Sequence, residues 1–381
     1  MIIIKQKKEC SQTNILRFIK TKNHKMKRLK TIFKNKKILI TGFNGFKGTW
    51  LSLCLHLLGA KLYGISLRSK EKNNHFNLLN KKIFIKKKYF DIGNYYQTVN
   101  FITNVKPDFV FHLAAQSLVF KSIKDPVFNW RTNVLGFLNV MIGLNKLKKK
   151  CIAVLITSDK CYKNLNKEVL YKENDILGGI DPYSASKASS EILFKSFYET
   201  YLKNINKLLT VCTARAGNVI GGGDWSEKRL IPDIMKCWLS NTVIPIRNPN
   251  ATRPWQHVLE AVMGYLILAN EMKKNPKLNG ESFNFSSNKI KNVSVLKFLK
   301  KIQIKNLKIR WKILKSKKFF ESKLLQLNNK KAKKILNWSS RLTFDETVTL
   351  VVEWYKQFKS DKKKIFNISK KQKNFYFSKI K

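Results

Sequence analysis

Residues 37–58 read as a strand, a glycine-rich turn and a helix, and this feature constrains the fold more than any other stretch of the chain. The apolar run KILI is followed by TGFNGFKG and then by the helical segment TWLSLCLHLL. Glycines at 42, 45 and 48 permit a tight turn, a close approach of the backbone to a pyrophosphate and close helix–strand packing. The helix N-terminus would then face the phosphates. The feature favours a dinucleotide-binding domain over a glycine-rich turn without a ligand.

Apolar runs alternate with helical segments through the first half of the chain. The pattern predicts strands at 61–67, 83–90, 109–113, 152–156 and 208–213, and helices at 94–105, 128–147 and from residue 181 onward. Strands separated by helices are typical of a parallel, doubly wound α/β sheet. Ligands bind such sheets at the carboxyl ends of the strands, so polar residues placed there are candidates for the functional site.

The chain divides into a large domain, a smaller lobe and two basic ends. We predict a disordered extension at 1–34, a dinucleotide-binding Rossmann domain at 35–213 to which 251–275 return, a smaller C-terminal substrate-binding α/β lobe at 214–250 and 276–358, and a mobile lysine-rich tail at 359–381. Helices at 258–272, 294–303, 328–338 and 343–358 and a strand at 282–286 are expected in the second half.

The composition argues against several classes of protein. The formal net charge is +53, but only 10 of the 76 basic residues are arginine, and lysines occur in every segment. Specific nucleic-acid binders usually favour arginine and a concentrated patch, so we expect no specific nucleic-acid partner. No run of 18 uncharged apolar residues is present, which argues against a membrane span. The six cysteines show no paired spacing and the five histidines no metal-ligand motif, so we expect a cytoplasmic protein with reduced thiols and no metal.

Polar residues follow the predicted strand IAVLI, at its carboxyl end. They include Ser158, Asp159 and Lys160, and a helix that starts 21 residues later carries Tyr183 and Lys187. Positions i and i+4 share one helix face, so the phenol and the ammonium can point at the same spot. A lysine cation and an oxidised nicotinamide would favour the phenolate and bring a pKa of about 10 towards neutrality, where a general base works best.

The Tyr-x-x-x-Lys pair alone is weak, because a chain with so many lysines contains it by chance. A second copy occurs at Tyr355 and Lys359, on a charged terminal helix. What distinguishes the pair at Tyr183 is the hydroxyl of Ser158 upstream and the glycine-rich turn earlier in the chain.

The candidate cofactor-binding residues follow the successive strands. An acidic residue is usual about 20 residues past the glycines, but Ser66, Leu67 and Arg68 stand there, and by the general rule arginine favours NADP. Asn133, in the predicted helix 128–147, is expected to be a structural hydrogen-bonding residue. The candidates are Gly42, Asn44, Gly45, Phe46, Gly48, Arg68, Asp91, Ile92, Ala114, Ala115, Gln116, Tyr183 and Lys187.

Four of the ten arginines, Arg215, Arg229, Arg247 and Arg253, fall within 39 residues after the predicted sheet. In a chain that uses lysine almost everywhere else, retained arginine indicates bidentate contact with phosphate or carboxylate, either in a ligand or in structural ion pairs. Trp255 beside them suits either stacking on a base or filling a core.

These segments together resemble the extended short-chain dehydrogenase/reductase family of NAD-dependent epimerases and dehydratases and, within it, the CDP-glucose 4,6-dehydratases. The resemblance covers roughly residues 31–358. Its general motifs are TGFNGFKG and YSASK. Its narrower motifs, in the right order, are GFKGTWL, TSDKCY, LGGIDPYSASK, ARAGNVIGGGDW, RLIPD, RNPNATRPWQHV and NNKKAKKILNW.

The resemblance implies a hydro-lyase of deoxysugar and surface-polysaccharide biosynthesis that acts on CDP-glucose with bound NAD. Oxidation at C4, loss of water across C5–C6 and return of the hydride to C6 would give CDP-4-keto-6-deoxyglucose. Tyr183 would take the 4-hydroxyl proton, Ser158 would hydrogen-bond that oxygen, and Lys187 would hold the nicotinamide ribose. Asp159 would protonate the departing hydroxyl.

The resemblance also assigns the remaining partners and leaves one position open. Asn218, Arg229 and Arg253 would bind the CDP diphosphate. The cofactor would be NAD, although Arg68 by itself favours NADP. The protein would form a homodimer. The related dTDP-glucose dehydratases remove the C5 proton with a glutamate at the place that Lys160 occupies here. A desolvated lysine has a depressed pKa and can act as a base, which makes Lys160 the candidate.

Two other functions fit some of the same residues. A nucleotide-sugar 4-epimerase, or another dehydratase of this fold, would share Ser158, Tyr183 and Lys187, although an epimerase does not require Asp159 and Lys160 as a pair. A cofactor-sensing or polyanion-binding protein could keep the fold without turnover, but it would not need the complete set of Ser158, Tyr183 and Lys187.

Overall fold

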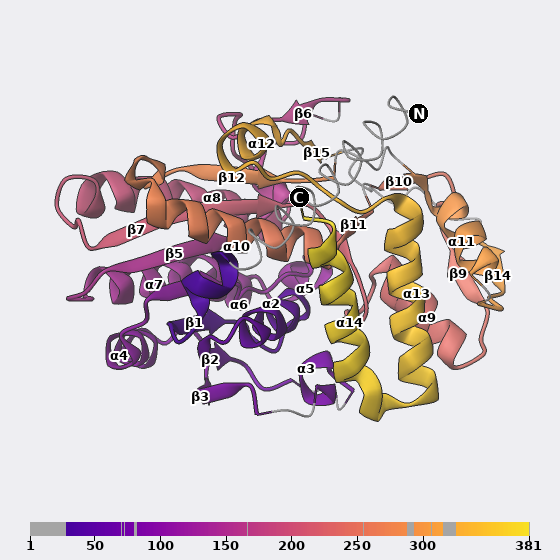
Figure 1. Ribbon diagram of the computed structural model, residues 1–381. Coiled ribbons are helices and arrows are strands. Elements are labelled where there is room, and N and C mark those ends of the chain that lie inside the picture. The colour runs from indigo at the N-terminus through magenta and orange to yellow at the C-terminus, as the bar shows by residue number, and fades with distance from the viewer. Residues whose placement is uncertain are drawn as a thin grey trace, which may run out of the picture.

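The computed structural model describes residues 28–69, 71, 73–79, 82–165, 167–253, 255–287, 293–305, 307–314 and 325–380. Its centre is a seven-stranded sheet in the order β12-β7-β5-β4-β1-β2-β3, and all six pairings are parallel (Figure 1). The strands are β1 (Lys37–Thr41), β2 (Lys61–Ser66), β3 (Phe84–Tyr89), β4 (Phe109–His112), β5 (Cys151–Ile156), β7 (Leu209–Ala216) and β12 (Ser282–Phe285). The strand order reverses between β1 and β4, which is where sheets of this kind open a binding crevice. The predicted doubly wound α/β fold is confirmed.

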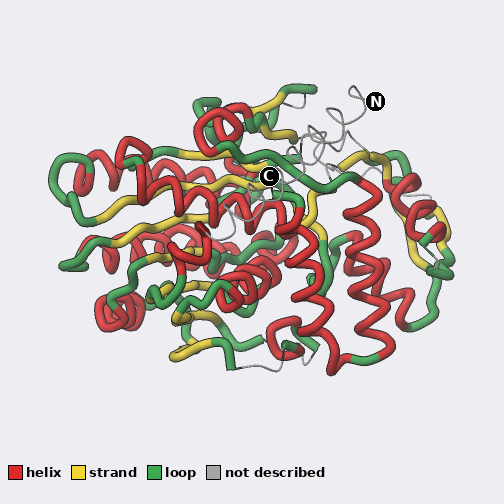
Figure 2. The backbone as a smooth tube through the Cα atoms, in the orientation of Figure 1, coloured by secondary structure: helices red, strands yellow, loops and turns green. Residues whose placement is uncertain are grey.

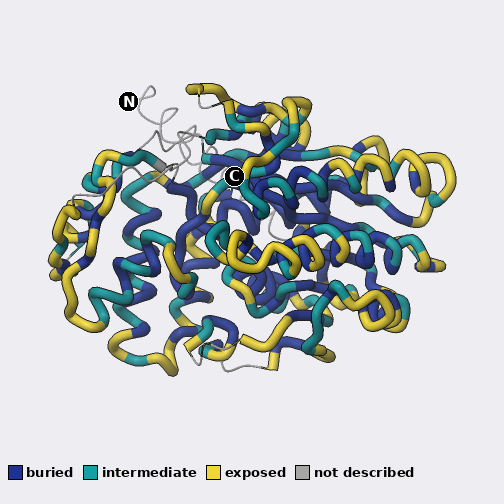
Figure 3. Tube along the Cα trace, turned by 180° about the vertical axis from the view of Figure 1, so that it is seen from behind, coloured by how far each residue is buried: buried dark blue, intermediate teal, exposed yellow. Residues whose placement is uncertain are grey.

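Helices cover both faces of the sheet because alternate strand residues point to opposite sides. Ile38 and Ile40 of β1 join the core that includes α2 (Phe46–Leu57) and α10 (Val258–Lys274). Leu39, between them, joins the core on the other face, with α4 (Tyr95–Val105), α7 (Gly136–Asn145) and α8 (Pro182–Phe197). Figure 2 shows the strands enclosed by helices, and Figure 3 shows the buried chain at the centre of the molecule.

The remaining elements extend the fold beyond the sheet (Figure 1). The helices are α3 (His75–Leu78), α5 (Val119–Lys124), α6 (Pro126–Trp130), α9 (Leu230–Leu239), α11 (Val295–Ile304), α12 (Lys330–Leu336), α13 (Phe344–Ser360) and α14 (Ile365–Ser378). The short strand pairs are β8 (Val219–Ile220) with β11 (Gln256–His257), β9 (Ile244–Ile246) with β14 (Trp311–Ile313), β10 (Thr252–Arg253) with β13 (Val293–Ser294), and β6 (Leu170–Tyr171) with β15 (Gln326–Leu327). Single turns lie at η1 (Arg131–Leu135), η2 (Asp159–Cys161), η3 (Tyr198–Leu202), η4 (Pro276–Leu278) and η5 (Lys362–Lys364). None of the described helices has the length and hydrophobicity needed to cross a bilayer.

The N-terminal extension was predicted too long. Residues 28–33 are helical, and Leu29, Ile32 and Phe33 are buried in the core, where the rings of Phe33 and Phe109 lie 5.1 Å apart. Spacing at i, i+3 and i+4 places these apolar side chains on one helix face. Residues 1–27 of the predicted extension lie outside the described part of the chain.

The mobile tail predicted at 359–381 is also wrong, since α14 is a packed helix. Ile365, Tyr376 and Phe377 are buried, and the Gln372 side chain donates to the Leu350 carbonyl at 2.7 Å. The lysines of this segment had suggested a solvated tail, but these buried residues give α14 a packed face.

The strand predicted at 282–286 lies in the central sheet and not in the smaller lobe. β12 pairs with β7 at the sheet edge. Phe283 and Phe285 are fully buried, and the Phe285 ring lies 5.8 Å from that of Tyr265 on α10. The apolar side chains of β12 therefore complete the core beneath α10.

Candidate functional site

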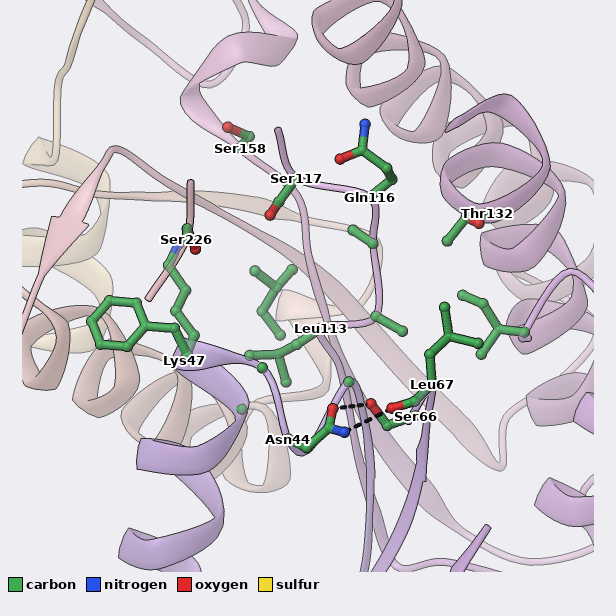
Figure 4. Close-up of a pocket in the computed structure, with 18 of the residues that line it drawn as sticks. Asn44, Lys47, Ser66, Leu67, Leu113, Gln116, Ser117, Thr132, Ser158 and Ser226 are labelled. Carbon is green, nitrogen blue, oxygen red and sulfur yellow. Dashed lines mark hydrogen bonds between the residues drawn. The ribbon is translucent and has the colours of Figure 1, made fainter. Parts of the chain in front are cut away.

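A cavity of about 500 Å³ opens at the carboxyl ends of the central strands (Figure 4). Ser158, Asn218 and Arg229 line it. So do all the residues predicted to bind the cofactor, namely Gly42, Asn44, Gly45, Phe46, Gly48, Arg68, Asp91, Ile92, Ala114, Ala115, Gln116, Tyr183 and Lys187. The structure therefore brings together residues that are far apart in the sequence.

The glycine turn packs so closely against neighbouring backbone that side chains would not fit at Gly42 and Gly48. Gly42 has a φ of +71°, and a Cβ there would lie 2.7 Å from the backbone nitrogen of Ala114. A Cβ on Gly48 would lie 2.0 Å from the Gly42 carbonyl oxygen. Helix α2 then starts after Gly45 with no side-chain cap and no acidic residue in its first turn. Its first backbone N–H groups have no intrahelical acceptor, so this cradle fits the pyrophosphate of a dinucleotide.

Asn44 and Ser66 lie near the end of β2, where the sequence lacks the acidic residue that usually binds the cofactor ribose. Asn44 donates to the Leu67 carbonyl at 2.7 Å and accepts a hydrogen bond from Ser66, as Figure 4 shows. The Arg68 guanidinium lies 4.8 Å from the centre of the Tyr89 ring. Two neutral side chains, the hydroxyl of Ser66 and the amide of Asn44, thus lie at this end of the cavity.

Asn133 joins the cofactor loop to the helix that carries Tyr183. Its amide nitrogen donates to the Gln116 carbonyl at 3.0 Å and to the Ser186 hydroxyl at 2.9 Å, and its oxygen accepts from the Gln116 backbone at 2.9 Å. Asn133 lies in η1, a π-helical turn between α6 and α7. Such turns often occur at functional sites. The predicted structural role of Asn133 is confirmed.

The Ser158 hydroxyl interacts with the side chains of both Asp159 and Tyr183. Its hydroxyl donates to Asp159 at 2.8 Å, and a hydrogen bond also connects Ser158 with the Tyr183 side chain. Burial raises the pKa of Tyr183, and the largest opposing effect comes from the Lys160 ammonium. The sequence predicts that Lys187 together with an oxidised nicotinamide makes this phenol acidic. In the protein alone the direction is the opposite, because desolvation of the phenolate outweighs the nearby cations.

Asp159 and Lys160 form a pair at the end of β5. The Lys160 ammonium lies 3.6 Å from the Asp159 carboxylate and 3.5 Å from the Asn218 oxygen. Asp159 is buried, and about a quarter of the Lys160 side chain is exposed. The pair therefore places an acid and an amine beside the cavity that contains Tyr183.

A buried ion pair between Arg215 and Glu191 contacts the chain just after the end of β5. Glu191, two helical turns after Tyr183, accepts from Arg215 at 2.7 Å and from Thr213 at 2.9 Å. It also accepts a hydrogen bond from Thr157, the residue before Ser158. Burial lowers the pKa of Lys187 to about 8, against the opposing charge of Glu191. Arg215 thus contacts a structural carboxylate, one of the two roles considered for the clustered arginines.

Four of the residues predicted to bind the substrate line a second cavity of about 580 Å³. Asn218 and Arg229 line both cavities, whereas Arg247 and Trp255 line only the second. Trp255 is also part of the core, where its ring packs 4.6 Å from Phe298 and its nitrogen donates to the Val293 carbonyl at 2.8 Å. The side chain of Arg253 lies outside the described part of the structure.

Sequence reasoning missed several residues that line the first cavity, among them Lys47, Ser117 and Ser226. The two serines follow no strand pattern that would mark them. Lys47 lies within the glycine motif, but a single lysine is not an informative signal in a chain with 76 basic residues. Its position between Gly45 and Gly48 was the available signal.

Comparison with known proteins agrees with this geometry. The family model described as GDP-mannose 4,6 dehydratase matches residues 39–351. The chain is 34% identical over 332 residues to CDP-glucose 4,6-dehydratase of Salmonella typhimurium, covering 86% of this chain and 92% of that protein. Among solved structures, an epimerase from Methanothermobacter thermautotrophicus aligns with a TM-score of 0.76 at 21% identity, over 87% of this chain and 95% of the other.

A second solved structure is dTDP-glucose 4,6-dehydratase from Bacillus anthracis in complex with NAD. It aligns with a TM-score of 0.69 at 21% identity and covers 84% of this chain and 97% of that chain. At this identity the two structures support the fold, while the family model and the Salmonella relative support the family. The chain therefore belongs to the GDP-mannose 4,6 dehydratase family, within the extended short-chain dehydrogenases/reductases.

Proposed function

We propose that this protein is a hydro-lyase that converts CDP-glucose to CDP-4-keto-6-deoxyglucose with bound NAD, as a step in deoxysugar biosynthesis. The observation that carries the proposal is the pair of Asp159 and Lys160, 3.6 Å apart, beside Ser158 and Tyr183. An epimerase needs the tyrosine and serine, but it does not need an acid and an amine at this place. The 34% identity to a CDP-glucose 4,6-dehydratase supports the same substrate.

The described residues fit the cofactor. The turn from Gly42 to Gly48 would hold its pyrophosphate, Asn44 and Ser66 its adenosine ribose, and Lys187 its nicotinamide ribose. Bound NAD would supply the redox chemistry, taking a hydride from the sugar and returning it.

The side chains supply the proton steps. Tyr183 would accept the proton of the sugar 4-hydroxyl, while the Ser158 hydroxyl holds that oxygen in place. Once C4 is a ketone, the proton on C5 becomes acidic. The Lys160 ammonium would first pass a proton to the neighbouring Asp159 carboxylate. The neutral Lys160 amine would then remove the C5 proton, and the protonated Asp159 would give its proton to the 6-hydroxyl, so that it leaves as water. Burial of Asp159 and Tyr183 excludes bulk water from these transfers.

The reaction is tested by product mass. Purified protein incubated with CDP-glucose and NAD should release a product lighter by one water molecule, detected by mass spectrometry. An unchanged mass with altered chromatographic retention would identify an epimerase instead. Absence of reaction with CDP-, dTDP-, UDP- and GDP-sugars would favour a non-catalytic protein.

Replacing Lys160 with methionine is expected to separate oxidation from dehydration. The variant should still form the 4-ketone, because Ser158 and Tyr183 remain, but incorporation of solvent deuterium at C5 should fall by about 10²- to 10⁴-fold with the loss of a general base. The measurement is mass spectrometry of the sugar after reaction in D₂O. Lys163→Met, in the loop after η2, is the control. Normal deuterium uptake in Lys160→Met would remove Lys160 from this role.

We also propose that two copies form a homodimer through α5, α6, η1 and α8. These elements pack together and expose large apolar side chains, namely Ile123, Val127, Trp130, Leu135 and Ile192. Exposed apolar patches on a protein surface commonly mark interfaces. Light scattering should give twice the chain mass for the wild type and the single mass for Val127→Glu with Ile192→Glu. Ile205→Glu, at an exposed site outside these elements, should remain dimeric. A monomeric wild type would contradict the proposal.

We place the enzyme in the cytoplasm. The five described cysteines are all unpaired, and four of them are buried. Unpaired thiols are typical of a reducing compartment.

A further inference from the structure

Lys47 is a cation in the active cavity to which the proposed mechanism gives no role. It is the second residue of α2, between Gly45 and Gly48 in the glycine turn. Its side chain lines the cavity together with Ser158. Figure 4 shows it rising from the start of the helix in the direction of Ser226, which also lines the cavity. The side chain therefore extends from the cofactor cradle into the space where a substrate would bind.

The charges around Lys47 place its ammonium at the reaction end of the cavity. The strongest charge interactions of Lys47 are with Asp159, Arg229, Lys187 and Lys160, in that order. Asp159 and Lys160 follow β5, Lys187 is on α8, and Arg229 precedes α9. None of the four lies at the adenosine end of the cradle. The Lys47 ammonium is thus within electrostatic range of the proposed reacting groups.

Two of the neighbouring cations, Lys160 and Arg229, have protein partners, whereas Lys47 has none among the described residues. The Lys160 ammonium lies 3.6 Å from Asp159, and the Arg229 guanidinium lies 3.4 Å from Asp224. Within the described part of the chain, no residue forms a hydrogen bond or ion pair with the Lys47 side chain. Burial lowers the pKa of Lys47 to about 8, against the opposing charge of Asp159. An ammonium in this position is stabilised when an anion enters the cavity.

We propose that Lys47 binds the sugar-linked phosphate of the nucleotide sugar, and so helps to hold the sugar against Tyr183. The inference rests on the proposed function, which puts a sugar diphosphate in this cavity. The sugar must reach Ser158 and Tyr183, and Arg229 borders the second cavity, so the diphosphate passes between them. Lys47 faces this passage from the glycine turn. The backbone of that turn remains available to the cofactor pyrophosphate.

Comparison of CDP with CMP tests the assignment, because only CDP carries the second phosphate. The protein is loaded with NAD, and the affinities of CDP and CMP are measured by isothermal titration calorimetry. Lys47→Met should weaken CDP by roughly tenfold to a hundredfold, the loss expected for one charge-assisted hydrogen bond. CMP affinity and NAD content should not change. Lys61→Met, exposed at the start of β2, is the matched control.

Further outcomes separate this inference from the proposed function. Equal weakening of CDP and CMP in Lys47→Met, or loss of NAD with an unchanged CDP-to-CMP ratio, would overturn the role of Lys47. If the wild type prefers CDP to CMP and the variant keeps the same ratio, only this inference fails. If the wild type binds neither, the proposed substrate is wrong and both fail. Lys47→Gln replaces the methionine variant if circular dichroism shows that the latter does not fold.

Discussion

Replacing Tyr183 with phenylalanine is expected to lower kcat by about 10²- to 10⁴-fold, which is the usual contribution of a positioned general base. The substitution removes one hydroxyl from a buried side chain, so the fold should persist. Because burial raises the pKa of Tyr183, the wild-type phenol is protonated at neutral pH before ligands bind. The rate should therefore rise with pH until the phenol of the ligand-bound protein is ionised. Steady-state rates of CDP-glucose conversion from pH 6 to pH 10 provide the measurement.

The second Tyr-x-x-x-Lys pair offers a matched control for this experiment. Tyr355 is also buried, and its hydroxyl donates to the Asp224 carbonyl at 2.6 Å. Tyr355→Phe should cost about 1–3 kcal/mol of stability through the unpaired carbonyl, while turnover at 25 °C stays near the wild-type rate. A Tyr183→Phe variant with wild-type kcat would refute the assignment of Tyr183 as the base.

Replacing Arg215 with methionine is expected to reduce the free energy of unfolding by about 3–5 kcal/mol at neutral pH, because it leaves a buried carboxylate without its partner. Arg215 and Glu191 lie 2.7 Å apart, and both side chains are almost fully buried. Burial alone would raise the pKa of Glu191, but Arg215 and the hydrogen bonds of Thr157 and Thr213 keep it below its usual value. Urea unfolding monitored by circular dichroism gives the change in stability.

The pH dependence gives an independent check on the ion pair. In the wild type, the folded pKa of Glu191 is lowered, so its contribution to stability is present above the unfolded pKa and is lost as the pH falls through the folded pKa. In Arg215→Met the carboxyl is buried without its ion-pair partner, so mild acid should recover part of the loss by protonating it. The double variant Arg215→Met with Glu191→Leu should be more stable than Arg215→Met alone. If the double variant is less stable than the single one, the ion pair is not the source of the effect.

The central fold could be predicted because all of its strands except β3 are largely buried. A continuous apolar run such as IAVLI can be recognised as a strand without knowing which strand it pairs with. The strands predicted at 37–40, 61–67, 109–113 and 152–156 all occur. The short pairs, such as β8 with β11, contain two residues per strand and leave no periodic pattern. The helical residues 28–33 and α14 were missed because they lie in basic terminal segments that suggest solvated chain, while a few buried apolar positions decide their packing.

The site could be located but not fully described from the sequence. Strand ends and glycine spacing identified many of the residues that line the first cavity, since parallel strands end at one edge of the sheet. The sequence could not show which effects determine the pKa of Tyr183. Lys160 is distant from Tyr183 in the sequence, and the cost of burying the phenol depends on packing. For the same reason, the contact of Arg215 with Glu191, and the free ammonium of Lys47, required three-dimensional positions.

Helix α14 determines when the molecule can finish folding. Tyr376 donates to the buried Glu260 of α10, Trp354 donates to Ser369 at 3.0 Å, and the same serine lies 3.1 Å from a ring nitrogen of His75. These partners are far apart in the sequence, at residues 75, 260, 354, 369 and 376. During synthesis the earlier segments emerge first, and Glu260 stays without this hydrogen bond until Tyr376 has left the ribosome. The protein thus completes this part of its interior only after α14 has been synthesised.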